Sequence, residues 1–245
     1  MEAGDPRHVV VTLDAPGIAR QVLPGQFVNV LISETGMPLL RRPFSVFMAT
    51  DTEIQLLFNI VGSGTRQLAE KNPGDTLDIL GPLGRPFTLA GSFTTPILVA
   101  GGLGVAALPL LARNLTNAGF TVRPFLGARD AGHLFDRYLG DAVVATDDGS
   151  MGFHGTIVDC LRSSLSSHPL PAPKIFACGP TPMLASLARF AAAAGIPCDV
   201  SLESPMACGI GICQGCPVEL TGGDKKFALV CTDGTVFDAN TIRWE

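Results

Sequence analysis

The sequence has little charge and few aromatic residues other than Phe. Asp, Glu, Lys and Arg make up 16% of its 245 residues, the net charge is −5, and there is one Trp and one Tyr. This composition indicates neither a nucleic-acid surface nor a surface for anionic membranes, and it offers no stacking platform for single strands. With 47% hydrophobic residues, the chain is globular and long enough for one large domain or two ordinary ones.

The N-terminus has no basic leader followed by an apolar run, so we expect no signal peptide. Residues 87–112 contain no charged side chain and are long enough to span a membrane. Glycines, prolines and polar residues interrupt this stretch, however, and favour a strand, a glycine loop and the start of a buried helix. We therefore expect a cytoplasmic protein without a membrane span.

Seven cysteines without a secretory signal indicate thiols or metal ligands rather than disulfides. Three of them have C-x4-C-x2-C spacing and a fourth follows after fourteen residues, which gives Cys208, Cys213, Cys216 and Cys231. This is the plant-type ferredoxin spacing for a 2Fe-2S cluster. The glycines between these cysteines permit the tight turns of such a loop, and their N–H groups can reach the sulfurs.

Two other interpretations of the four cysteines stay open. The first is a zinc site, although only Cys213 and Cys216 have the C-x2-C spacing that zinc usually takes. The second is a set of buried cysteines without a metal. We interpret Cys160 and Cys198, which have no partners in the sequence, as buried core thiols.

The chain divides into three regions of different texture, which we predict as units at residues 1–92, 93–200 and 201–245. In the first, short β-like runs with Pro-Gly punctuation predict an antiparallel β-barrel; the runs are 9–13, 27–32, 53–60 and 75–80. In the second, strands alternate with helices and predict an α/β domain with a parallel sheet. Its predicted strands are 96–100, 121–126, 142–146 and 174–177, and its helices are 106–118 and 181–194. The third is too small for its own core, so a metal cluster would stabilise it.

Two motifs in the first region suit a phosphate-bearing cofactor. In the first, Arg42-Pro43-Phe44-Ser45, the Arg can pair with a phosphate and the Ser hydroxyl can reach a ring nitrogen; its alternative is a surface Arg before a strand. In the second, Gly64 and Thr65 precede a short helix predicted at 66–71, where a helix N-terminus suits a phosphate. An ordinary N-cap is the alternative there.

Two further motifs follow predicted parallel strands. Gly101, Gly102 and Gly104 stand between a buried strand and a helix, as in a dinucleotide loop, although G-x-G-x-x-G is absent and no acidic residue selects NAD over NADP. Cys178-Gly179-Pro180 ends another strand, and ligands bind at the carboxyl ends of such strands. The alternative for Cys178 is a buried core thiol.

Together, these motifs resemble the ferredoxin-reductase-like flavoproteins, and with the four-cysteine segment the chain looks specifically like the electron-transfer subunit of B-type dihydroorotate dehydrogenase. The most specific part of the resemblance is the segment from Glu203 to Gly234 that holds the cysteines. The chain departs from the family at Ala107, where Pro is common, and at Asn59, where Arg is common.

The resemblance implies FAD, a 2Fe-2S cluster on the four cysteines, and NAD as co-substrate. It places FAD against residues 42–45, Gly64 and Thr65 and a neighbouring strand with Leu57, Phe58 and Asn59, and NAD near residues 178–180. It implies an FMN-containing catalytic subunit as partner, in a heterotetramer with two copies of each, and electron flow from dihydroorotate to NAD in pyrimidine biosynthesis. We expect no catalytic acid or base in this chain, because the cofactors carry the chemistry.

Two alternative functions remain. One is a NAD(P)H-dependent flavin and iron–sulfur reductase subunit that serves another acceptor, such as ferredoxin or a sulfur compound. Relatives of that kind often replace a cluster cysteine with Asp, whereas all four are Cys here. The other is a non-enzymatic binding module with a zinc knuckle.

Overall fold

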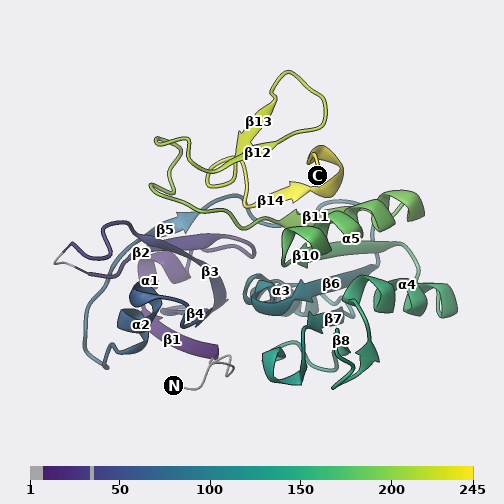
Figure 1. Cartoon of the computed structure of the whole chain (residues 1–245), viewed down its shortest axis with the longest axis horizontal. Helices are drawn as coiled ribbons and strands as arrows, with labels where there is room; N and C mark the ends of the chain where they lie inside the picture. Colours follow the sequence, from purple (N-terminus) through teal and green to yellow (C-terminus); the bar gives the residue numbers. More distant parts are fainter. Residues whose placement is uncertain (1–7, 34–35, 245) are drawn as a thin grey trace.

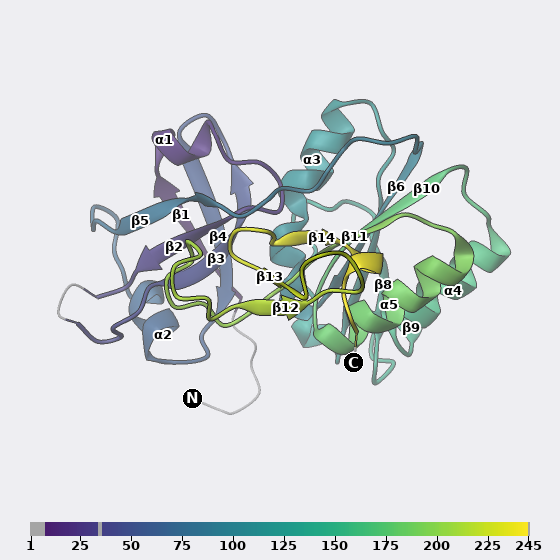
Figure 2. The ribbon, with the colours of Figure 1, turned by 90° about the horizontal axis from the view of Figure 1, so that it is seen from above.

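The computed structural model describes residues 8–33 and 36–244. The N-terminal residues on which the expectation of no signal peptide rests lie mostly outside this part. Two halves lie side by side, and the C-terminal segment crosses over the junction between them (Figures 1 and 2).

The first half is a five-stranded antiparallel sheet with strand order β1-β4-β3-β2-β5, which we call the N-terminal sheet. Its strands alternate between core and outer face: Val28 and Val30 are fully buried in the core that β2 covers. The two helices of this half are α1 (Pro16–Ala19) and α2 (Ser63–Ala69). The strands are β1 (His8–Asp14), β2 (Phe27–Leu31), β3 (Arg42–Ala49), β4 (Glu53–Asn59) and β5 (Asp78–Leu83).

The second half is a seven-stranded sheet with order β14-β11-β10-β6-β7-β8-β9, in which β14 alone is antiparallel. The strands are β6 (Thr95–Gly101), β7 (Arg123–Ala128), β8 (Val143–Thr146), β9 (Phe153–His154), β10 (Pro173–Cys178), β11 (Cys198–Ser201) and β14 (Val236–Asp238). The helices are α3 (Pro109–Asn117), α4 (Ile157–Ser167) and α5 (Thr181–Ala194), with short 3-10 turns η1 (Gly102–Ala107), η2 (Ala131–His133) and η3 (Ala239–Thr241).

The C-terminal segment has little secondary structure besides a hairpin of β12 (Pro217–Glu219) and β13 (Phe227–Leu229). It is tied to both halves, because β14 extends the second sheet and the hydroxyl of Thr235 donates to the carbonyl of Gly25 in the first. Arg85 also binds it through its backbone N–H to Gly234 and its side chain to Thr232. The segment therefore bridges the two halves.

The predicted fold class, with an antiparallel unit, a parallel-sheet unit and a small C-terminal cluster module, is confirmed; the boundaries at 92 and 200 stay predictions. Residues 87–112 form β6, η1 and the start of α3, and none of the helices in the described part of the chain has the length and apolarity to cross a membrane. Some elements differ in detail. Helix α2 begins at Ser63, so Gly64 and Thr65 lie within it rather than before it as predicted. Strands β5 and β7 begin later than predicted, and η1 delays the next helix to Pro109. Helix α4 and the strands β3, β9 and β11 were not predicted individually.

Candidate functional site

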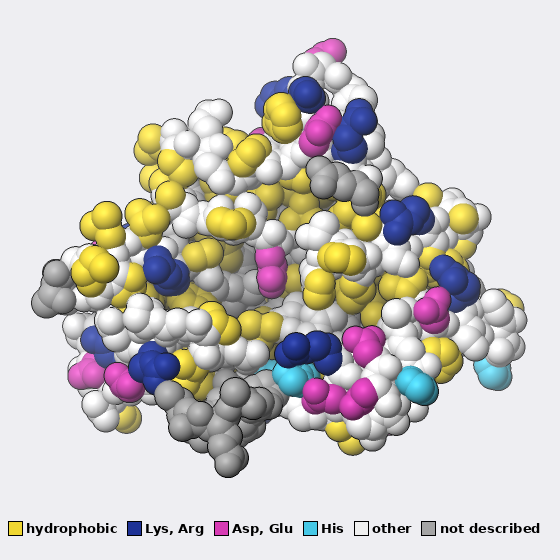
Figure 3. Space-filling view, in the orientation of Figure 1, with side chains coloured by type: hydrophobic (Ala, Val, Ile, Leu, Met, Phe, Trp, Pro, Cys, Tyr) yellow, Lys and Arg dark blue, Asp and Glu magenta, His cyan; other side chains and the backbone are white. Residues whose placement is uncertain are grey.

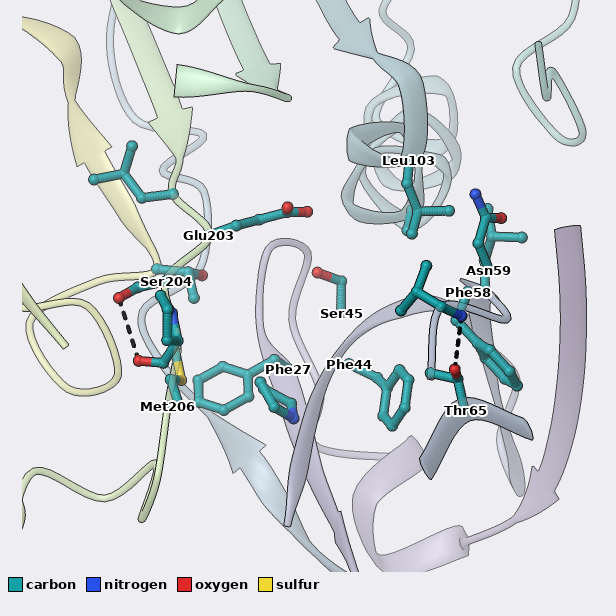
Figure 4. A pocket seen from close by; sticks show the side chains of 17 residues that line it. Phe27, Phe44, Ser45, Phe58, Asn59, Thr65, Leu103, Glu203, Ser204 and Met206 are labelled. Atoms are coloured by element: carbon teal, nitrogen blue, oxygen red, sulfur yellow. Dashed lines mark hydrogen bonds between the residues drawn. The ribbon is translucent and has the colours of Figure 1, made fainter. Parts of the chain in front are cut away.

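A cavity of about 450 Å³ lies between the N-terminal sheet, the glycine loop and the C-terminal segment. Its size is typical of ligand pockets, and we call it the first pocket. Apolar side chains dominate its walls, with a hydroxyl from Ser45 and another from Thr65 (Figure 4). Seven residues of the predicted flavin motifs line it: Pro43, Phe44, Ser45, Leu57, Phe58, Asn59 and Thr65.

Local structure explains how these motifs meet. Strands β3 and β4 are neighbours, so the residues after Arg42 face the same space as the end of β4. Thr65 lies in the first turn of α2, where its hydroxyl accepts hydrogen bonds from the N–H groups of Val61 and Gly62 at 2.9 and 3.2 Å. This hydroxyl therefore caps the helix, as the alternative interpretation of this motif holds, and also lines the pocket.

The two other predicted flavin residues, Arg42 and Gly64, lie beside the first pocket and do not form its wall. A Cβ on Gly64 would lie 3.5 Å from the Arg42 Nε, so Arg42 packs against the start of α2. Its Nη1 donates to the carbonyl of Leu40 at 2.8 Å. The guanidinium thus stands next to a helix N-terminus, where an anion is favoured.

Sequence reasoning missed the contribution of the C-terminal segment to the first pocket. Five consecutive residues from Leu202 to Met206 line it, together with Phe27 and Thr235. Glu203 points into the cavity from the end of β11 (Figure 4), and burial raises the pKa of its carboxyl. Glu203 is nevertheless exposed to solvent. The position of Glu203 after a strand of the parallel sheet was the available signal.

A second cavity of about 500 Å³, the second pocket, lies at the carboxyl ends of β6, β7, β8 and β10. Ligands of open α/β sheets bind at this edge. Of the predicted nicotinamide residues, Gly101, Gly102 and Pro180 line the second pocket. Asn59 and Leu103 line both pockets, so the two cavities are adjacent.

The other three predicted nicotinamide residues, Gly104, Cys178 and Gly179, do not line the second pocket but pack behind the loops that do. Cys178 is fully buried, and burial followed by the charge of Glu203 raises the pKa of its thiol. A Cβ on Gly104 would lie 2.3 Å from the Cys178 carbonyl oxygen, and one on Gly179 would lie 3.0 Å from the Gly101 nitrogen. The glycine loop and the Cys-Gly-Pro loop therefore meet backbone to backbone, which a side chain at Gly104 or Gly179 would prevent.

The residues present fit a flavin and a nicotinamide dinucleotide. The Oδ1 atom of Asn59 is buried, and the described residues give it no hydrogen-bond partner. An orphan acceptor at the junction of two adjacent pockets is expected where ligand donors complete the hydrogen bonding. The apolar rings of Phe44 and Phe58 in the first pocket suit a flat aromatic ligand.

The four predicted cluster cysteines form two pairs. The backbone N–H of Cys213 approaches the Cys208 sulfur at 3.4 Å, and Cys216 and Cys231 are buried in one apolar cluster. Within residues 8–33 and 36–244, no three His, Cys, Asp or Glu side chains are arranged around one metal ion. The four cysteines would hold a 2Fe-2S cluster, with one pair as ligands to each iron, and this arrangement in pairs suits such a cluster better than a single zinc.

The two cysteine pairs differ in environment. Cys216 and Cys231 are buried in one apolar cluster with Phe27 and Met206, which line the first pocket. Cys213 is exposed and Cys208 half-buried. The pair of Cys216 and Cys231, the inner pair, is therefore buried, and the pair of Cys208 and Cys213, the outer pair, is the more exposed of the two.

Backbone N–H groups of Cys213 and Ile210 approach the Cys208 sulfur at 3.4 and 3.5 Å, and they lower the pKa of this thiol to about 6. The thiolate is the form that binds a metal. Burial raises the pKa of Cys231 to about 11. Cys160 and Cys198 are buried core thiols, as predicted.

Comparison with known proteins adds the following. A model of the iron-sulfur cluster binding domain of dihydroorotate dehydrogenase B matches residues 203–243. The chain is 38% identical over 248 residues to the electron transfer subunit of dihydroorotate dehydrogenase B (NAD(+)) of Desulforamulus reducens, with 98% of this chain and 94% of that one covered. It is also 38% identical to the Bacillus caldolyticus protein of the same name, over 96% of this chain and 93% of the relative.

Solved structures share the fold. A structure of an NADH-dependent reduced ferredoxin-NADP oxidoreductase, described for flavin-based electron bifurcation, superposes with a TM-score of 0.86 at 29% identity, over 99% of this chain and 86% of that one. A ferredoxin reductase of carbazole 1,9a-dioxygenase has a TM-score of 0.65 at 22% identity, covering 79% of this chain and 63% of its own, and it supports the fold alone.

Proposed function

Since the chain belongs to the family of electron-transfer subunits of dihydroorotate dehydrogenase B, we propose that it passes electrons from the FMN of a catalytic subunit, by way of a 2Fe-2S cluster and FAD, to NAD. The electrons come from the oxidation of dihydroorotate to orotate, a step of pyrimidine biosynthesis. Membership in this family and the paired cysteines favour this function over the zinc knuckle.

The bound groups supply the redox chemistry: NAD exchanges a hydride, the cluster exchanges single electrons, and FAD is able to do both. The chain supplies their placement. In this proposal the first pocket holds the flavin ring between β3, β4 and the segment at Glu203, while Arg42 and the start of α2 attract its phosphates. The second pocket brings the nicotinamide to the same junction, beside Asn59 and Leu103.

The observation that carries the proposal is the position of the cysteines. The inner pair shares an apolar cluster with Phe27 and Met206 of the first pocket, whereas the outer pair opens to solvent. In this proposal the cysteines hold a one-electron carrier between the first pocket and the surface. This arrangement suits a subunit that exchanges single electrons with a partner and a hydride with NAD.

We place the docking face for the catalytic subunit around the outer cysteine pair. Ile210 and Ile212, which lie between Cys208 and Cys213, are 42% and 78% exposed. Figure 3 shows hydrophobic side chains gathered over the upper left of the molecule, where the cysteine segment lies above the N-terminal sheet. An exposed apolar surface of this kind is expected at a protein interface. We propose a cytoplasmic heterotetramer with two copies of each subunit.

Co-expression with a candidate FMN subunit tests the function. We expect a stable complex whose dihydroorotate oxidation yields orotate and reduces NAD in equal amounts. The matched variants are Cys231→Ser and Cys198→Ser, which alter two buried thiols, only one of them at the cluster. Cys231→Ser removes the coupled NAD reduction, and Cys198→Ser retains it.

The same co-expression experiment also distinguishes between the possible electron acceptors. A purified chain with a flavin and an iron–sulfur spectrum that forms no complex and no orotate contradicts the dihydroorotate function and favours a reductase for another acceptor. A colourless chain that contains zinc contradicts both electron-transfer functions.

A further inference from the structure

Asn29 is a fully buried polar side chain at the contact between the N-terminal sheet and the cysteine loop. Its neighbours in β2, Val28 and Val30, face the core of the sheet, so Asn29 faces the opposite side. There its Nδ2 donates a hydrogen bond to the carbonyl oxygen of Cys208 at 3.1 Å. A strand of the flavin-binding half thus contacts the first cysteine of the cluster directly.

The loop closes tightly on this amide. Gly209 has a φ of +70°, and a Cβ at this position would lie 2.5 Å from the Asn29 Nδ2. Only glycine adopts this conformation readily and leaves the necessary space. The fit shows that the turn after Cys208 is built around the side chain of Asn29.

Packing alone does not account for an asparagine at this position. The Oδ1 atom is buried, and it has no partner in the described part of the chain. A leucine of similar size would fill the space without burying an unpaired acceptor, which carries a cost. The feature that distinguishes the asparagine is therefore its N–H donor to Cys208.

That donor fixes the peptide between Cys208 and Gly209. The turn that follows aims the N–H groups of Ile210 and Cys213 at the Cys208 sulfur, at 3.5 and 3.4 Å. Hydrogen bonds to ligand sulfurs tune the reduction potential of a cluster, since they stabilise added negative charge. The same amide stands on β2, whose residue Phe27 pairs with Ser45 of the first pocket.

We propose that Asn29 is a positioning residue that holds the Cys208 turn in the shape that sets the cluster potential. The inference rests on the proposed function only in that Cys208 binds the cluster. Loss of the donor weakens the N–H···S contacts, so the cluster becomes harder to reduce.

The test is a redox titration of the purified chain loaded with FAD and cluster, followed by electron paramagnetic resonance. Asn29→Leu keeps the volume and removes the donor; we expect a more negative cluster midpoint potential and altered g values, with an unchanged flavin potential. If leucine does not fit in this space, Asn29→Ala replaces it, because alanine removes the donor without adding atoms. We expect Asn29→Ala to shift the cluster midpoint potential in the same direction.

The matched control is Thr221→Val, which removes a side-chain hydrogen bond from Thr221 to the Asn240 carbonyl at 2.6 Å, also in the C-terminal segment. We expect Thr221→Val to leave the midpoint potential of the cluster unchanged. The proposal is overturned if both Asn29 variants retain the wild-type potential and g values, or if Thr221→Val shifts them equally. A wild-type chain that takes up no cluster instead contradicts the proposed function.

Discussion

At the scale of single residues, Glu203 places a carboxyl with a raised pKa in the first pocket. A carboxyl whose pKa is higher in the folded than in the unfolded state stabilises the fold below its unfolded pKa, and this stability is lost as the pH rises through the folded pKa. Because ionisation of Glu203 in the cavity is disfavoured, its carboxyl supports the ligand-free fold less as the pH rises.

We expect Glu203→Gln to raise the Tm of the ligand-free chain by about 1–2 °C near pH 7, a small change because water reaches the side chain. Near pH 4 the variant and the wild type differ less. Differential scanning fluorimetry at the two pH values measures this, with Glu53→Gln on the exposed end of β4 as control. An equal rise at both pH values contradicts the assignment.

The residues of the first pocket show which parts of a binding site can be predicted from a sequence. Pro43 to Ser45 and Leu57 to Asn59 were predicted because they carry a family resemblance, and the pairing of β3 with β4 brings them together. Glu203 was noted only as part of the cysteine motif. Its place in the first pocket depends on where β11 ends against the other half, which no local pattern encodes.

At the scale of elements, the glycine loop and the end of β10 act as one unit, because Gly104 lies against the carbonyl of Cys178. Gly104→Ala puts a methyl group 2.3 Å from that oxygen, so backbone must move. We expect it to lower the unfolding free energy by about 1–3 kcal/mol and to raise the KM for NADH by about tenfold or more.

Urea unfolding and NADH:ferricyanide kinetics measure the two effects. Gly17→Ala is the control, since a Cβ there meets no atom within 4 Å. A Gly104→Ala enzyme with wild-type stability and KM contradicts the backbone-to-backbone contact.

Helix α5 was predicted over its full length, since its Ala-rich sequence favours a helix and Gly195, with a φ of +65°, ends it. Helix α4 was missed because serines interrupt its apolar pattern. Its signal was the Thr156 side chain that caps it by accepting from the Asp159 N–H. The late start of α3 follows from η1, whose tighter turns pack the glycine loop against β10.

At the scale of the whole molecule, the C-terminal segment joins the two halves and presents the outer cysteine pair to solvent. We expect Ile212→Glu to weaken binding to the catalytic subunit about tenfold or more, because a charge replaces an apolar side chain at the proposed interface. The flavin and cluster spectra of the isolated chain stay unchanged. Val143→Glu is the control, since Val143 is 43% exposed on β8, far along the second sheet.

Binding is measured by interferometry against the immobilised catalytic subunit. Equal affinity of Ile212→Glu and wild type places the interface elsewhere. The sequence predicted a cluster in residues 201–245, but not the division of the cysteines into inner and outer pairs. That division arises because Cys216 and Cys231 are buried in the same apolar cluster as Phe27, which is distant from the cysteine motif along the chain.

Because Cys213 is exposed, the sensitivity of the protein to oxygen depends on what covers this residue. A cluster held by the four cysteines would be open to dissolved oxygen on the side of the outer pair and shielded on the side of the buried inner pair. A docked catalytic subunit would close that side, so the partner protects the cluster as well as exchanging electrons with it. We expect the free subunit to bleach in air and the complex to keep its colour, which makes balanced production of the two chains a condition for a durable enzyme.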